Sequence, residues 1–266
     1  MGAGSTVFAK NVLGDCMFKE ALKDSHIALY DIDKNRLEES VKMLTVLNKN
    51  VNDNRAKITA HLGAGNRKKA LKGADFVVNA IQVGGYEPST VIDFEIPKKY
   101  GLKQTIADTL GIGGIFRALR TIPVMLDFGH DMEEVCPDAW LLNYTNPMAM
   151  LTGAMLRGTN VKTVGLCHSV QVCAFGLMRS LGLFETENCQ DNPIHAFNSL
   201  GYHTKIAGIN HMAWLLDITD KNGKDIYPEM RKLGKKIIKK YRGGKVKHGN
   251  LIRLEMMDKF GYPRSS

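Results

Sequence analysis

The hydrophobic positions of the chain fall into short runs, and longer amphipathic stretches separate them. The apolar runs are rich in Val, Ile and Leu, and they span His26–Ile32, Lys57–His61, Asp75–Val83, Trp140–Thr145 and Val161–Cys167. Between them, helical spacing predicts helices such as residues 33–50. Strands that alternate with helices are typical of a parallel sheet with crossover helices. The pattern predicts an α/β protein with a Rossmann-like, doubly wound parallel sheet.

The pattern changes near residue 188. Beyond this point, residues His203–Ile218 have the composition of extended sheet, and a lysine-rich helix follows them. We therefore expect two domains. Residues 1–188 would form a dinucleotide-binding domain, and residues 189–266 would form part of an α+β domain for substrate and metal.

A glycine motif opens the chain. Gly2-Ala3-Gly4-Ser5 supplies two glycines of G-x-G-x-x-G, Val7 occupies the third glycine position, and Asp31 ends the next predicted strand. Such glycines let the backbone approach a pyrophosphate at a helix N-terminus, and the acidic residue bonds a ribose hydroxyl. The alternative is a tight turn with a capping aspartate. The motif favours a dinucleotide site, and an acid at position 31 favours NAD over NADP.

A glycine loop of this kind follows a strand, but only Met1 precedes Gly2. In a doubly wound sheet that first strand is central and has a neighbour on each side. We therefore expect the first strand to be missing and the chain to begin inside the natural protein.

Length and composition narrow the class of protein. The 266 residues, of which 44% are hydrophobic, suffice for one or two domains with a substantial core. No apolar run approaches the roughly 18 residues of a membrane span, and the N-terminus lacks a basic and apolar leader. Five irregularly spaced cysteines are typical of a reducing compartment. We expect a cytoplasmic protein with free thiols and no membrane partner.

The net charge of +9 is a local feature. The segment Arg231–Arg253 contains ten Lys or Arg and no acid, so the remaining 26 basic and 27 acidic residues sum to −1. Its lysines recur at helical spacing, which is typical of a solvated helix face. Because the segment has one aromatic residue, Tyr241, and no recognisable binding motif, we expect no nucleic-acid partner. A basic nucleic-acid-binding segment is the alternative.

Polar clusters follow two of the apolar runs. Cys167-His168-Ser169 begins at a strand end, and Gly208-Ile209-Asn210-His211 lies in apolar surroundings. A thiolate and an imidazole can hold a soft or borderline divalent metal, whereas the alternative is a buried cysteine and a hydrogen-bonded core histidine. Asn143–Pro147 fits either a helix cap or a grip on sugar hydroxyls. Tyr262 is most simply a packed aromatic residue.

Taken together, these residues resemble glycoside hydrolase family 4, and within it the bacterial α-galactosidases (melibiases). The resemblance covers nearly all of Gly2–Tyr262. It rests on the segments MGAGSTVFAKNVLGD, ALYDIDKNRLEES, GGYEPSTVIDFEI, QTIADTLGIGGIFRALR, EVCPDAWLLNYTNPMAM, VGLCHSVQ and AGINHMAW.

The resemblance implies two cofactors, NAD and Mn²⁺. The dinucleotide would be held by Gly2, Gly4, Ser5 and Asp31. The metal ligands would be Cys167 and His211.

The resemblance also implies residues at the substrate. Asn146 would contact the sugar, and Tyr262 is the candidate base at C2. His168, a second catalytic candidate, stands where the phospho-sugar branch carries asparagine. This favours an unphosphorylated α-galactoside, with an α-glucoside or α-glucuronide as alternatives.

The implied activity is hydrolysis of an α-galactoside by oxidation, elimination, addition and reduction at the sugar ring. This family is an exception to the two-carboxylate mechanism. The resemblance further implies an incomplete member, which lacks the C-terminal portion of the substrate domain and is itself inactive, and a homo-oligomer when full length. An NAD-dependent 2-hydroxy acid dehydrogenase of the lactate/malate type is the alternative enzyme, because it shares the nucleotide domain.

Overall fold

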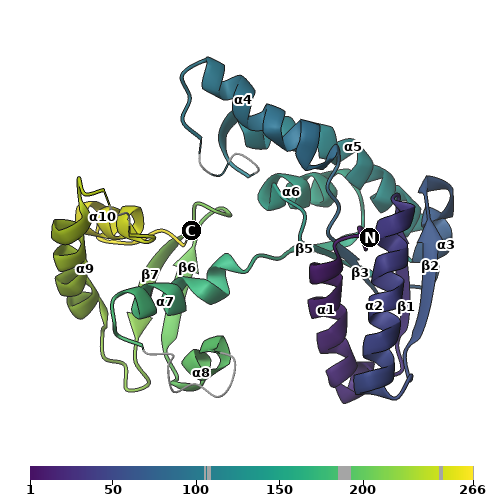
Figure 1. Cartoon of the computed structure of the whole chain (residues 1–266), viewed down its shortest axis with the longest axis horizontal. Coiled ribbons are helices and arrows are strands. Elements are labelled where there is room, and N and C mark those ends of the chain that lie inside the picture. The colour runs from purple at the N-terminus through teal and green to yellow at the C-terminus, as the bar shows by residue number, and fades with distance from the viewer. Residues whose placement is uncertain (105, 107–108, 185–192, 246–247, 266) are drawn as a thin grey trace. The chain divides into compact units, whose positions relative to one another are not determined.

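The computed structural model describes residues 1–104, 106, 109–184, 193–245 and 248–265. It divides into two compact units, Met1–Leu166 and Cys167–Ser266, which we describe one at a time (Figure 1). The predicted boundary between residues 188 and 189 lies outside the described residues.

The strands of the first unit are all parallel. They form a two-stranded sheet and a three-stranded sheet, with the orders β1-β2 and β3-β4-β5. Their bounds are β1 His26–Asp31, β2 Lys57–Leu62, β3 Phe76–Asn79, β4 Trp140–Asn143 and β5 Lys162–Gly165. All five fall within or overlap the predicted apolar runs, so the Rossmann-like α/β architecture is confirmed.

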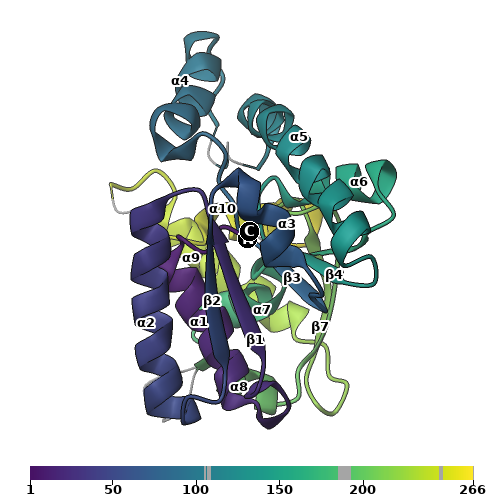
Figure 2. The same ribbon diagram turned by 90° about the vertical axis from the view of Figure 1, so that its right-hand side faces the viewer.

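Helices cover both faces of these strands. They are α1 Thr6–Phe18, α2 Lys34–Asn52, α3 Arg67–Leu71, α4 Val91–Lys99, α5 Gly111–Val135 and α6 Met148–Gly158. Figure 2 shows α1 and α2 running along β1 and β2. Consecutive residues of β1 enter different clusters, since Leu29 packs with Met17 and Leu44 whereas Tyr30 packs with Met125. Strand β1 is therefore buried on both sides, as strands of other doubly wound sheets are.

The first three residues lie between the two sheets. The Met1 amine donates to Val78 O at 2.8 Å, and Met1 O accepts from Ala80 N at 3.0 Å, both beside β3. On the other side, Ala3 N donates to Tyr30 O of β1 at 3.0 Å. No described strand pairs with both β1 and β3.

The second unit is a small α+β assembly. Its elements are α7 Ser169–Ser180, α8 Pro193–Ser199, β6 His203–Ala207, β7 Trp214–Thr219, α9 Tyr227–Tyr241 and α10 Leu251–Phe260. Strands β6 and β7 are antiparallel, so the predicted extended stretch is two strands joined by a turn. The C-terminal segment pairs with the start of β7, because Leu215 N donates to Pro263 O and Ser265 N donates to Ala213 O.

The basic segment is largely a helix with one solvated face. In α9, Met230 and Ile238 are buried, whereas Lys235 and its neighbouring lysines are exposed. Lys235 lies 3.7 Å from the Asp258 carboxylate of α10. Exposed pairs of this kind contribute about 0–1 kcal/mol. Within the part of the chain that the structure describes, no helix is long and apolar enough to cross a membrane.

Candidate functional site

The glycine loop is tied to the end of β1. Gly4 N donates to Asp31 Oδ2 at 2.6 Å, and Asp33 N donates to Asp31 Oδ1 at 2.9 Å. A Cβ on Gly4 would lie 2.8 Å from Asp31 Oδ2, so the loop and the carboxylate approach closely only with glycine here. The structure therefore brings together Gly4 and Asp31, two residues of the predicted dinucleotide site.

The same loop leads into the N-terminus of α1. Gly2 has φ +75°, and a Cβ there would lie 2.7 Å from the Ala80 carbonyl carbon. Ser40 of α2 is fully buried, and its hydroxyl donates to Ala3 O at 2.6 Å. This hydrogen bond connects the glycine loop to α2. Ser5 precedes Thr6 without a side-chain cap, which leaves amides of the first turn available for an anion.

A buried polar network lies at the carboxyl ends of β3 and β4. Asn79 Nδ2 donates to Asn143 Oδ1 at 3.0 Å and to Thr145 Oγ1 at 3.1 Å. Thr145 N donates to Asn143 Oδ1 at 3.0 Å. The next residue, Asn146, is half-buried, and its carbonyl accepts from Arg117 Nε at 3.1 Å. This network positions the predicted sugar ligand Asn146 at the edge where open α/β sheets bind ligands.

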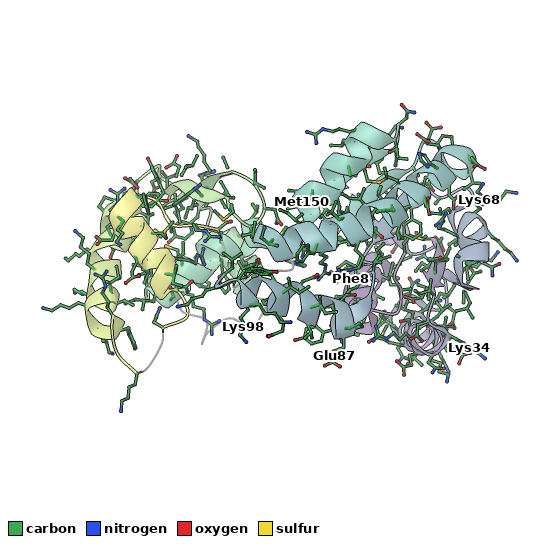
Figure 3. The ribbon with its side chains drawn as sticks, turned by 90° about the horizontal axis from the view of Figure 1, so that it is seen from above. Phe8, Lys34, Lys68, Glu87, Lys98 and Met150 are labelled. Atoms are coloured by element: carbon green, nitrogen blue, oxygen red, sulfur yellow. The ribbon has the colours of Figure 1, made fainter. Side chains whose placement is uncertain are left out.

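Sequence reasoning missed Asn79 and Arg117. An asparagine inside an otherwise apolar strand was a usable signal for Asn79, because buried amides require partners. Tyr144, in the same loop, meets the ring of Phe8 edge-on at 4.8 Å, and Figure 3 shows Phe8 on α1. Helix α1 thus also supports the Asn143–Pro147 segment.

A second missed feature is an ion pair between α4 and α5. Arg120 contacts both carboxylate oxygens of Asp93 at 2.7 and 3.1 Å, and Asp93 is 1% exposed. Arg120 Nε also donates to Val83 O at 3.1 Å. The ion pair joins α4 to α5, and the bond to Val83 O fixes the start of the Gly84–Thr90 segment against α5.

Cys167 and His211 form the second part of the candidate site. They are 44 residues apart in the chain, yet Cys167 Sγ lies 3.2 Å from His211 Nε2. Ser169 Oγ lies 3.2 Å from the same sulfur, at the start of α7. Cys167 follows the end of β5 by two residues, as the sequence predicted. The structure therefore brings the two predicted ligands together.

His211 is held through its backbone. Arg264 Nη2 donates to His211 O at 3.0 Å, and Arg253 Nε donates to Arg264 O at 2.8 Å. Arg253 also reaches Cys173 Sγ of α7 at 3.2 Å. A chain of contacts thus connects α7, which begins beside Cys167, to the turn that carries His211.

The donor set fits a divalent metal. Thiolate sulfur binds such ions at about 2.3 Å and imidazole nitrogen at about 2.1 Å, so two donors that face each other can share one ion. Within the described residues, no group of three or more His, Cys, Asp or Glu is suitably placed. Further ligands would therefore be supplied by water or by a bound molecule, as in catalytic sites with open positions.

The two catalytic candidates have different surroundings. His168 is exposed and immediately precedes α7. The Tyr262 ring lies edge-on to Tyr227 at 5.9 Å between centroids and is 41% exposed. Burial raises the pKa of Tyr227, whose hydroxyl donates to Leu215 O. The roles of His168 and Tyr262 stay predictions.

The parallel strands and flanking helices of the first unit define a Rossmann-type fold. A model described as "Family 4 glycosyl hydrolase" matches residues 1–183, and a model of the C-terminal domain of the same family matches residues 206–265. The chain belongs to this family.

A curated relative supports the same family assignment. The chain is 57% identical to an alpha-galactosidase of Bacillus subtilis over 262 residues, which are 98% of this chain and 55% of that protein. It therefore spans about half the length of this relative.

Two solved structures have the same fold. A putative glucosidase, lplD, from B. subtilis matches with a TM-score of 0.81 and 23% identity, over 100% of this chain and 59% of that one. A 6-phospho-alpha-glucosidase from gut microorganisms, solved with NAD and Mn²⁺, has a TM-score of 0.78 and 21% identity, over 99% and 57%.

Proposed function

We propose that this chain carries the NAD and Mn²⁺ sites of a family 4 α-galactosidase that acts on unphosphorylated α-galactosides. The observation that carries the proposal is the 3.2 Å approach of Cys167 Sγ to His211 Nε2. A 2-hydroxy acid dehydrogenase has no evident use for a thiol–imidazole pair, so this approach favours the glycosidase. The 57% identity to an alpha-galactosidase supports the choice of sugar.

The first unit would hold the dinucleotide. Asp31 retains acceptor capacity beside its two backbone donors and would bond the ribose hydroxyls. Gly2 and Gly4 keep the backbone free of side chains, and Ser5 and the amides of the first turn of α1 would face the pyrophosphate. Asn146, set by the Asn79–Asn143–Thr145 network, would orient the sugar.

The second unit would hold the metal through Cys167 and His211. When bound, NAD⁺ and Mn²⁺ would supply reversible hydride removal at the sugar ring and Lewis-acid stabilisation of the charge that develops there. Tyr262 would accept the C2 proton, and His168 would lie at the position that excludes a sugar phosphate. NAD would be regenerated in each cycle, so no net redox change accompanies hydrolysis.

Metal binding tests the proposal on this chain. Co²⁺ titration of the reduced protein should produce a thiolate charge-transfer band, and Cys167→Ser or His211→Ala should abolish it. Cys16→Ser is the matched control, because Cys16 is also a half-buried free thiol and lies in α1. Burial raises the pKa of the Cys16 thiol. A band that persists in Cys167→Ser would contradict the proposed ligand.

An activity assay tests the rest of the proposal, namely the reaction, its cofactors and its substrate. With NAD⁺, Mn²⁺ and a thiol reductant, the protein extended to the length of its relatives should cleave an aryl α-galactoside without accumulating NADH. Full activity after removal of both cofactors would contradict the mechanism. Stoichiometric NADH formation from a 2-hydroxy acid would identify the dehydrogenase instead.

A further inference from the structure

The sulfur of Cys167 has a second polar neighbour besides His211. Ser169 Oγ lies 3.2 Å from Cys167 Sγ, and Ser169 N donates to the same sulfur at 3.4 Å. The imidazole Nε2 of His211 approaches this sulfur at 3.2 Å. One residue therefore directs two polar groups at a candidate metal ligand, and the proposed function assigns neither group a role.

The position of Ser169 at the start of α7 explains the contact through its amide. The first amides of a helix have no partner within the helix, and the side chain just before it commonly accepts one of their hydrogen bonds. His168 occupies that place and makes no such side-chain cap. The sulfur of Cys167, one residue earlier, accepts the Ser169 N–H instead. Because the N-terminus of a helix favours negative charge, this arrangement suits a thiolate.

The direction of the hydroxyl contact follows from the chemistry of the metal-bound state. Either atom of the Ser169–Cys167 pair can donate while the sulfur carries a proton. A cysteine that binds a metal is a thiolate, which has no proton and can only accept. The Ser169 hydroxyl is then the donor, and a hydrogen bond to a charged acceptor is stronger than one between neutral groups.

Two hydrogen bonds from one residue also restrict the Cys167 side chain. Because the backbone of Ser169 belongs to α7, its amide and its hydroxyl hold the sulfur where it meets His211 Nε2. Hydrogen bonds to a thiolate draw electron density from the sulfur and so change how strongly it donates to a metal. Ser169 is therefore placed to affect both the position and the electronic character of the ligand.

We propose that Ser169 is a positioning residue of the metal site, whose hydroxyl donates to the Cys167 thiolate and holds the sulfur toward an ion shared with His211. Ser169 contacts the ligand and not the ion. The proposal rests on the proposed function, because it takes Cys167 and His211 as the metal ligands. It adds that the hydroxyl at position 169 tunes the bond between the thiolate and the metal.

Co²⁺ titration of the reduced chain tests the role of the hydroxyl. The thiolate-to-Co²⁺ charge-transfer band reports how readily the sulfur gives up an electron. In Ser169→Ala the donor is lost, so this band should move to longer wavelength, and the Co²⁺ dissociation constant should rise by about tenfold. The band position is a property of the occupied sites alone. Partial unfolding of a variant would therefore lower the amplitude of the band without moving it.

Two further variants are matched to this change. Ser169→Thr keeps a hydroxyl at the same place and should retain the band position and the Co²⁺ affinity of the wild type. Ser180→Ala removes a serine hydroxyl from the other end of α7, where it donates to Leu177 O at 2.9 Å. This variant should leave both the band position and the affinity unchanged.

An identical band position in Ser169→Ala and the wild type would overturn the proposal, and so would a shift in Ser169→Thr as large as that in Ser169→Ala. A changed intensity of the Co²⁺ d–d bands in Ser169→Ala would indicate a lost ligand, which would identify Ser169 Oγ as a direct ligand and also overturn it. In these cases the wild-type charge-transfer band is present and the Cys167–His211 site stands. Absence of the band from the wild type would instead overturn the proposed function and this proposal with it.

Discussion

Arg264 donates a 3.0 Å hydrogen bond from Nη2 to the main-chain oxygen of His211. Because Arg253 holds the Arg264 carbonyl and also contacts Cys173, the two arginines connect α7 to the turn that places the His211 imidazole beside Cys167. The spacing of the candidate metal ligands is thus set by residues near the end of the described chain.

Arg264→Ala should weaken metal binding while leaving both ligands in place. Loss of the bond to His211 O frees the turn, and outer-shell changes typically cost 10–100-fold in metal affinity. We expect the Co²⁺ dissociation constant to rise by about tenfold, with the charge-transfer band retained at high Co²⁺. Arg242→Ala is the control, because Arg242 makes an exposed pair with Glu255. Equal affinities of the Arg264 and Arg242 variants would show that the contact does not position His211.

Gly4→Ala should impair NAD⁺ binding. The added Cβ would lie 2.8 Å from both Asp31 Oδ2 and Arg36 Cβ, so the loop must move away from Asp31. Overpacking of this kind costs about 1–3 kcal/mol. We expect a lower melting temperature and at least tenfold weaker NAD⁺ binding by fluorescence titration. Gly65→Ala, where a Cβ meets nothing within 4 Å, should leave both values near those of the wild type. Tight NAD⁺ binding by Gly4→Ala would remove this loop from the proposed site.

The contact between Gly4 and Asp31 is one that sequence reasoning anticipates. The pairing of Gly4 with Asp31 follows from local order, since a loop, a helix and a strand end meet wherever a Rossmann unit forms. The prediction that Cys167 and His211 lie close together rested on the family resemblance, because 44 residues separate them in the chain.

Other contacts depend on packing that the sequence does not encode locally. The Asp93–Arg120 pair joins helices across 27 residues, and neither residue belongs to a recognisable motif. The Arg253–Arg264–His211 connection likewise depends on how the final segment pairs with β7. Tertiary geometry determines which residues form such contacts. In a basic chain with many arginines, the sequence alone does not indicate which arginine will be the partner.

Asp93→Asn should destabilise the first unit strongly. It leaves Arg120, whose side chain is 25% exposed, without its carboxylate partner. Removal of one member of a buried pair costs about 3–5 kcal/mol. Asp138→Asn is the control, because Asp138 is fully exposed and lies 3.5 Å from Lys162. Urea unfolding should show a large decrease in the free energy of unfolding for Asp93→Asn and little change for Asp138→Asn. Equal unfolding midpoints would indicate that the Asp93 pair contributes no more than a surface contact.

The Met1 amine should make stability depend on pH between about 6 and 8. Burial lowers its pKa from 8.0 to about 6, although the Asp31 charge opposes the shift. The unfolded chain therefore binds more protons in this window, and the free energy of unfolding rises with pH. A shift of two pKa units corresponds to up to about 2.7 kcal/mol in the free energy of unfolding. This stability is fully lost below pH 6 and is recovered above pH 8. Nα-acetylation keeps an N–H for Val78 O but removes the titration. The difference in unfolding free energy between the acetylated and free forms should shrink as pH rises through this window, and a constant difference would place the amine in water.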